Sequence, residues 1–69
     1  MTIRQFRKFI KDNKLYLEIV NDETGYSFGC YKINDENLIY STRLLNAKIK
    51  EISAQYYEGK RFIILKVEV

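Results

Sequence analysis

The stretch KLYLEIVNDETGYSFGCYKI, residues 14–33, decides the fold because it predicts two strands joined by a tight turn. In its first part, Leu15, Leu17 and Ile19 occupy every second position, which is the period of a strand with one buried face. Residues 21–25, NDETG, form the expected hairpin loop, because Asn, Asp and Gly favour turns and Gly accepts a positive φ. This part of the chain therefore predicts a β-hairpin.

The return strand of this hairpin is expected over residues 26–33. The alternation places Tyr26, Phe28 and Cys30 on one face, and Cys30 is interpreted as a small buried apolar residue. A glycine within a strand indicates a bulge or a close approach of two backbones, so Gly29 marks an irregular point. The other face of the strand is expected to carry Ser27, Gly29, Tyr31 and Ile33.

Ahead of the hairpin, residues 2–12 predict an amphipathic helix. Thr2 and Gln5 have the spacing of a capping box, in which each side chain accepts from a backbone amide at the start of the helix. Asn13 is expected to end the helix, since Asn tolerates a left-handed backbone. The apolar stripe of this helix, which we expect to face the core, consists of Ile3, Phe6, Phe9 and Ile10.

Basic side chains lie beside the apolar stripe and form the first candidate binding surface. This basic helix stripe is defined by Arg4, Arg7, Lys8, Lys11 and Lys14. One interpretation is a solvated helix face; the other is a contact with a nucleic-acid backbone or an acidic protein. Residues 1–14 carry net charge +4, residues 15–37 carry −4 and residues 38–69 carry +3. The net charge of +3 is therefore distributed as a dipole.

The second half of the chain predicts an irregular connection followed by another hairpin. Residues 34–46 are expected to hold one short helix, with Asn34 and Ser41 as candidate caps. Residues 48–57 predict a strand with a bulge near Ile49, and 58–61 predict the turn. Residues 62–69 are apolar enough for a central strand.

Together these elements predict one α+β domain over residues 1–69, in the order α-β-β-(short α)-β-β. The N-terminal helix is expected to pack on a small antiparallel sheet of about four strands. The expected core of the sheet consists of Leu15, Leu17, Ile19, Phe28, Leu65 and Val67. One helix does not cover both faces, so a second, exposed face is predicted from Tyr16, Val20, Tyr31, Ile33, Tyr56, Phe62 and Ile64.

This second face is the other candidate surface, with Tyr16, Tyr31, Tyr56, Phe62 and Ile64 as its candidate interface residues. Three interpretations stay open. The connection over residues 34–46 fills the face, or a second copy of the chain covers it as a homodimer. Alternatively, nucleobases stack on it, although residues 61–66 lack the glycine and paired aromatics of a ribonucleoprotein motif.

Composition argues against most enzyme chemistry. The chain of 69 residues has no His and one Cys, which excludes an imidazole base, a His-ligated metal and an internal disulfide. We therefore expect no enzyme activity, no catalytic residue, no metal and no cofactor. No apolar run approaches the length needed to cross a bilayer, so no membrane partner is expected, and the lack of disulfides suits the cytoplasm. The carboxylates Glu18, Asp22, Glu23, Asp35 and Glu36 are interpreted as turn and cap residues.

The pattern as a whole resembles small proteins encoded by phages and mobile elements of low-GC bacteria. It is carried by TIRQFRKFIKDN at residues 2–13, the Asp/Gly hairpin and FIILKVEV at residues 62–69. Ile, Lys, Asn, Tyr and Phe, which A/T-rich codons encode, make up 32 of the 69 residues. Proteins of this kind include inhibitors of host defence such as anti-CRISPR proteins, which act by occupying a protein surface.

The resemblance implies a non-enzymatic inhibitor that docks on a host defence protein or ribonucleoprotein in the bacterial cytoplasm. The alternative is a small nucleic-acid-binding module that uses the basic helix stripe, whose affinity would fall steeply with salt.

Overall fold

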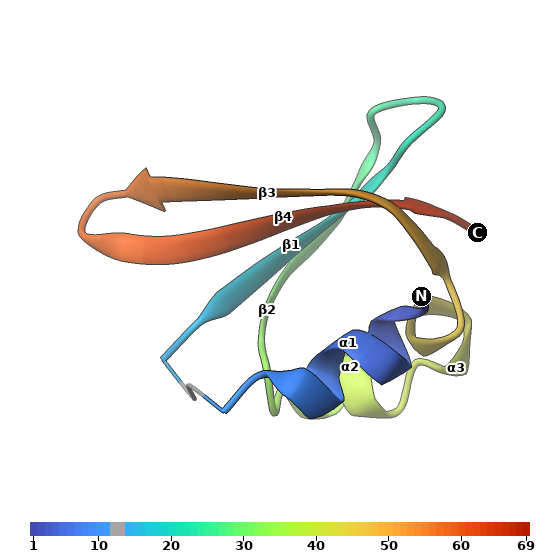
Figure 1. Cartoon of the computed structure of the whole chain (residues 1–69), viewed down its shortest axis with the longest axis horizontal. Helices are drawn as coiled ribbons and strands as arrows, with labels where there is room; N and C mark the ends of the chain where they lie inside the picture. Colours follow the sequence, from blue (N-terminus) through green and yellow to red (C-terminus); the bar gives the residue numbers. More distant parts are fainter. Residues whose placement is uncertain (12–13) are drawn as a thin grey trace.

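The computed structural model describes residues 1–11 and 14–69 (Figure 1). Helix α1, Ile3–Phe9, begins at Thr2, whose hydroxyl accepts from the Gln5 amide at 3.2 Å while the Gln5 side chain accepts from the Thr2 amide at 2.9 Å. The predicted capping box is therefore confirmed. The helix ends earlier than expected because Ile10 adopts an extended backbone, which lets its side chain pack against the core. The predicted helix end at Asn13 lies outside the described residues.

The strands β1 (Tyr16–Asn21), β2 (Ser27–Lys32), β3 (Lys48–Tyr57) and β4 (Lys60–Glu68) form one sheet with the order β2-β1-β4-β3. The pairs β1–β2 and β3–β4 are antiparallel hairpins, whereas the inner strands β1 and β4 are parallel. The α+β class and the order α-β-β-α-β-β are thus confirmed, but the sheet is mixed and not antiparallel throughout. The reason is that the connection after β2 carries the chain to the opposite edge of the sheet, which places the two hairpins side by side.

The connection between the hairpins forms two short helices where one was expected. These are α2, Glu36–Ile39, and α3, Thr42–Leu45. Asp35, and not Asn34, caps α2 by accepting from the Asn37 amide at 2.9 Å. Ser41 caps α3 as predicted.

The core lies between the sheet and the three helices, which gather on one side of it (Figure 1). Leu38, Leu44 and Leu45 of α2 and α3 belong to the same cluster as the sheet residues, so the connection does not fill the other face. Phe9 is 73% exposed, contrary to expectation, because it lies about 90° around the helix from the middle of the buried side chains. The buried cluster consists of Ile3, Phe6, Leu15, Leu17, Ile19, Ile33, Leu38, Leu44, Leu45, Ala47, Leu65 and Val67.

A bulge in β2 reverses the expected assignment of the faces from Gly29 onward, while Phe28 packs against the core as expected. Ile19 pairs with Gly29 but the next residue of β1 pairs with Ser27, so Phe28 is the extra residue. Gly29 has φ of +124°, which side chains rarely allow, so the predicted irregularity is confirmed. After the bulge, Tyr31 faces the helices, where it is partly buried.

The prediction that Tyr31 and Ile33 lie on the exposed face is therefore wrong, and Ile33 is part of the core. The prediction that Cys30 is buried is wrong as well, because it is exposed on the side away from the helices.

Candidate binding surface

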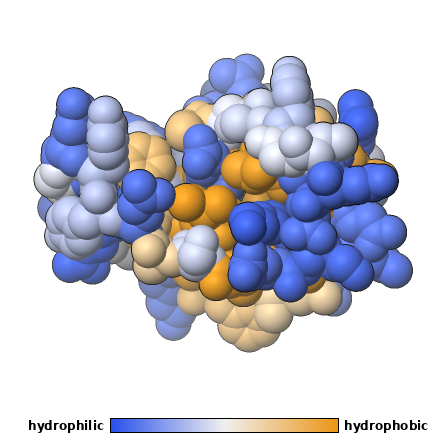
Figure 2. All heavy atoms as spheres, turned by 90° about the horizontal axis from the view of Figure 1, so that it is seen from above, coloured by the Kyte–Doolittle hydropathy of each residue, from blue (hydrophilic) through white to orange (hydrophobic). Residues whose placement is uncertain are grey.

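The sheet face away from the helices carries half-exposed aromatic and apolar side chains on its central strands. We call it the open sheet face and define it by Tyr16, Glu18, Val20, Cys30, Lys32, Gln55, Tyr57, Lys60, Phe62, Ile64 and Lys66, which strand alternation and register place on one side. Figure 2 views it from the side opposite the helices and shows hydrophobic atoms in the middle, between hydrophilic side chains at both ends. On the central strands, Tyr16, Phe62 and Ile64 are half-buried by their neighbours.

One end of this face combines aromatic rings with cations. Tyr16 pairs with Lys32 on one side and with Phe62 on the other. The rings of Tyr16 and Phe62 lie 5.4 Å apart between centroids, and the ammonium groups of Lys60 and Lys32 lie 5.4 and 5.8 Å from the Tyr16 centroid. Cations at this distance are attracted by the ring quadrupole. The register of three strands therefore builds an aromatic centre with two ammonium groups beside it.

A hollow of about 450 Å³ adjoins this aromatic centre. Lys14 comes from the segment before β1, and Arg61 comes from the start of β4, where its Nε donates to the Tyr56 hydroxyl at 3.4 Å. Four cationic side chains thus share one end of the sheet, and an anionic or acidic group placed there is favoured electrostatically. We call this the basic end and define it by the lining of the hollow, namely Lys14, Tyr16, Lys32, Tyr56, Gly59, Lys60 and Arg61.

The middle of the open sheet face holds a carboxylate beside a thiol. The Glu18 Oε2 atom accepts from the Ser27 hydroxyl at 3.4 Å and from the Cys30 Sγ at 3.8 Å. Desolvation by neighbouring atoms raises the pKa of the Cys30 thiol, and the negative charge and hydrogen bond of Glu18 raise it further. Cys30 therefore stays protonated at neutral pH and is a poor nucleophile.

This contact predicts how the thiol reacts. In the variant Glu18→Gln the negative charge is gone, so the pKa of Cys30 falls towards its usual value and the thiolate fraction at pH 8 rises. We expect a several-fold faster alkylation of Cys30 by iodoacetamide at pH 8, and rates that converge at high pH. The matched control is Glu51→Gln, since Glu51 pairs with Lys66 at 3.0 Å. Equal alkylation rates in Glu18→Gln and in the unmodified chain would contradict the assigned role of Glu18.

The basic helix stripe is divided by the fold. The Arg7 Nε donates to the carbonyl oxygen of Ile33 at 2.9 Å, and Arg4 donates to the Asn46 side chain at 3.3 and 3.4 Å. These two arginines fasten α1 to the connection between the hairpins. Lys8 is exposed on α1 and Lys11 is exposed beyond the end of the helix, while Lys14 belongs to the basic end.

The candidate interface residues separate in the same way. Tyr16, Phe62 and Ile64 come together on the open sheet face as expected. Tyr31 lies on the helix side, where its hydroxyl donates to the Phe28 carbonyl at 3.0 Å, and Tyr56 alternates to the helix side near the hairpin tip.

Lys32 and Lys60 were missed as site residues. Lys60 lies two residues before Phe62, so the alternation already contains its signal, whereas Lys32 shares a face with Cys30, which the alternation assigned to the core. What the sequence lacks is the position of the bulge in β2, which turns Lys32 to the open sheet face, and the pairing of β1 with β4, which brings Lys60 to the same tyrosine.

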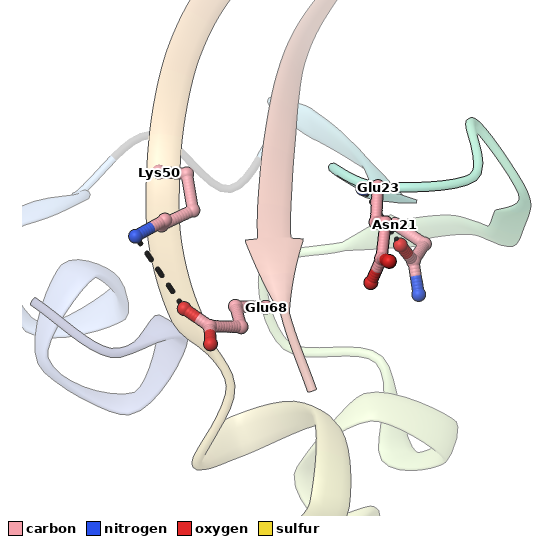
Figure 3. A network of polar contacts seen from close by, with 4 residues as sticks. All are labelled: Asn21, Glu23, Lys50 and Glu68. Atoms are coloured by element: carbon pink, nitrogen blue, oxygen red, sulfur yellow. Dashed lines mark hydrogen bonds and ion pairs between the residues drawn. The ribbon is translucent and has the colours of Figure 1, made fainter.

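The opposite end of the sheet is acidic and is held by turn contacts. The Asn21 Oδ1 atom accepts from the amides of Glu23 and Thr24 at 2.9 and 3.1 Å. Nearby, Lys50 of β3 pairs with Glu68 of β4 at 3.4 Å (Figure 3). Among residues 1–11 and 14–69, no group of three or more His, Cys, Asp or Glu is placed to hold a metal ion. In the same part of the chain, no helix has the length and apolar character needed to span a membrane.

Comparison with protein-family models, with curated proteins and with solved structures finds no match for this chain.

Proposed function

We propose that this chain is a binding protein without catalytic activity, which covers part of the surface of another macromolecule with its open sheet face. The observation that carries the proposal is the position of Tyr16, Phe62 and Ile64. They lie half-exposed on the two central strands, while α1, α2 and α3 lie on the other side of the sheet (Figure 1). Exposed apolar and aromatic patches with a polar rim are typical of interaction sites.

The size of the face fits this role. Seen onto this face (Figure 2), the Cα positions extend over 29 by 19 Å, and the chain exposes 4918 Å² in total. A stable interface takes roughly 800 Å² from each partner. One side of this molecule therefore supplies an interface of ordinary size, and occlusion needs no deep pocket.

The class of target follows from the resemblance to phage-encoded and mobile-element-encoded inhibitors. It makes a host defence protein or ribonucleoprotein in the bacterial cytoplasm the proposed partner. The cations of Lys32 and Lys60 lie beside the aromatic centre, so the basic end is complementary in charge to an acidic surface. We therefore expect the contact surface of the partner to be acidic.

The test compares two Phe→Ser variants. Phe62→Ser removes the centre of the open sheet face, whereas Phe9→Ser removes a 73% exposed side chain from α1. Tagged protein is incubated with nuclease-treated lysate of a low-GC bacterium, and the captured proteins are quantified by mass spectrometry. We expect Phe62→Ser to lose about tenfold or more of the specific capture, as for a central aromatic anchor, and Phe9→Ser to retain it. Equal capture by both variants would overturn the proposal.

The second candidate function is nucleic-acid binding, which the cations around Tyr16 and Phe62 favour. Stacking aromatics beside cations are typical of proteins that bind single strands. This function predicts that recovery depends on intact nucleic acid and falls steeply with salt. The contacts of Arg4 and Arg7 shift its expected site from the basic helix stripe to the basic end.

A further inference from the structure

The outer edge of β3 is protected along its first half, whereas no strand among the described residues pairs with its second half. The chain start covers the first half: the Ile49 amide donates to the Met1 carbonyl at 2.8 Å, and Thr2 bridges Lys48. A bulge and charged side chains follow at residues 50 and 51. The segment ISAQYY, residues 52–57, then carries no charge and no proline. Natural sheets usually protect such edges with charges, proline or bulges.

The turn at the end of this edge determines which backbone groups point outward. Tyr57 pairs with Lys60 across the two residues Glu58 and Gly59, which both have positive φ, as in a type I′ hairpin turn. The closing pair of such a turn exchanges hydrogen bonds, and bonded and non-bonded pairs then alternate along the ladder. Every second residue from Tyr57 therefore bonds to β4. The residues between them, Ile52, Ala54 and Tyr56, direct their amides and carbonyls to the outer edge.

We propose that a second copy of this chain pairs with this edge in antiparallel fashion, about a two-fold axis at Ala54. In this register Ala54 lies opposite Ala54 of the second copy, and Ile52 lies opposite Tyr56 of the second copy. All three outward residues of both copies then find backbone partners. Other two-fold registers leave at least one of the three outside the paired segment or set it against the bulge.

The side chains agree with this register. Ile52 is 49% exposed and Tyr56 is 68% exposed, so both have apolar surface to bury. An aromatic residue opposite a β-branched one is a favourable cross-strand pair. At each end of the paired segment Lys50, which also pairs with Glu68 of its own chain, comes level with Glu58 of the second copy, so no like charges lie directly opposite each other. A second copy fits better than an unrelated strand because it carries Lys50 before this segment and Glu58 after it. In an antiparallel pair the lysine of each copy therefore comes level with the glutamate of the other.

This inference goes beyond the proposed function, because pairing at the edge leaves the open sheet face uncovered. The dimer joins two four-stranded sheets into one of eight strands, and both open faces become parts of one larger surface. A partner bound by both copies would be held more tightly than by one.

The first test is sedimentation equilibrium of the unmodified chain up to about 100 µM, which saturates an interface with micromolar Kd. We expect a monomer–dimer equilibrium. In Ala54→Pro the outward amide is removed while the ladder to β4 is kept, and proline is tolerated at such edge positions. We expect Ala54→Pro to sediment as a monomer at every concentration. A monomeric unmodified chain over the whole range would overturn the proposal.

The second test fixes the register and does not need the proline variant to fold. In a Cys30→Ser background, Ala54→Cys places two thiols opposite each other across the axis, within the Cα distance of about 4.4–6.8 Å that a disulfide spans. Ser53→Cys is the control, since Ser53 would lie opposite Gln55 of the second copy. We expect mild oxidation to give a covalent dimer with Ala54→Cys and little with Ser53→Cys. A dimer that cross-links equally at both positions would contradict pairing about Ala54.

Discussion

Replacing Leu65 with alanine should unfold most of the chain at room temperature or bring it close to its unfolding midpoint. Leu65 is fully buried on β4, between Ile19 of β1 and Ile52 of β3. Large-to-small changes at such positions cost about 2–5 kcal/mol, because a cavity remains. At about 0.05–0.15 kcal/mol per residue, a chain of 69 residues has roughly 3–10 kcal/mol of stability in total. The loss is therefore comparable with the whole free energy of unfolding.

The matched control is the next residue of the same strand. Ile64→Ala also shortens a branched aliphatic side chain, but Ile64 lies on the open sheet face and is only half-buried. We expect it to cost about 1 kcal/mol, since less apolar area is removed from water. Denaturant unfolding followed by circular dichroism measures both variants. Equal losses would show that the two faces of β4 are covered to the same extent, contrary to the structure.

The local features of the fold were predictable because each depends on neighbours in the chain. The Thr2–Gln5 capping box, the Asn21–Gly25 loop, the Ser41 cap and the bulge near Ile49 all follow from side-chain chemistry at short spacing. The two caps and the loop use hydrogen bonds within a few residues, so the sequence contains both partners, and the bulge follows from a break in the alternation of one strand.

The arrangement of the two hairpins was not predictable in the same way. Either antiparallel or parallel contact of β1 and β4 fits the same alternation, and the choice depends on the path of the connection over the helix side. The helices α2 and α3 in that connection have four residues each, which is about one turn. One turn is too short to give the hydrophobic period of a helix in the sequence. No local feature of the sequence therefore distinguished a mixed sheet from the expected antiparallel one.

The same limit applies to the candidate site. Tyr16, Phe62 and Ile64 were correctly placed by alternation alone. The pairing between β1 and β4, the strands that carry them, contains no bulge that would change the face of a residue. Lys60 reaches the Tyr16 ring only through the parallel pairing of β1 with β4, and Lys32 reaches it through a hairpin register that depends on the bulge at Phe28. The contacts that Arg4 and Arg7 make with other segments are long-range, and the charge pattern of α1 gives no hint of them.

Gly29→Ala is the substitution outside the core with the largest expected cost. Gly29 has φ of +124°, outside the left-handed region that other residues enter, and such strain costs about 1–3 kcal/mol. An added Cβ would also lie 3.3 Å from the Tyr31 hydroxyl. That hydroxyl donates to the Phe28 carbonyl at 3.0 Å, so Tyr31 does not move aside without loss of a hydrogen bond. We therefore expect the upper part of this range.

Gly25→Ala separates strain from crowding. Gly25 has φ of +77° in the hairpin loop, and nothing lies within 4 Å of its added Cβ, so we expect a loss of roughly 1 kcal/mol. Denaturant unfolding compares the two variants, and alkylation of Cys30 reports the register of β2. If Gly29→Ala slips the register to remove the bulge, Cys30 turns towards the core and reacts more slowly in the folded protein. A Gly29→Ala variant as stable as Gly25→Ala, with unchanged alkylation of Cys30, would show that the bulge does not need glycine. The division of β2 between core and open sheet face would then depend on Tyr31 and Ile33 alone.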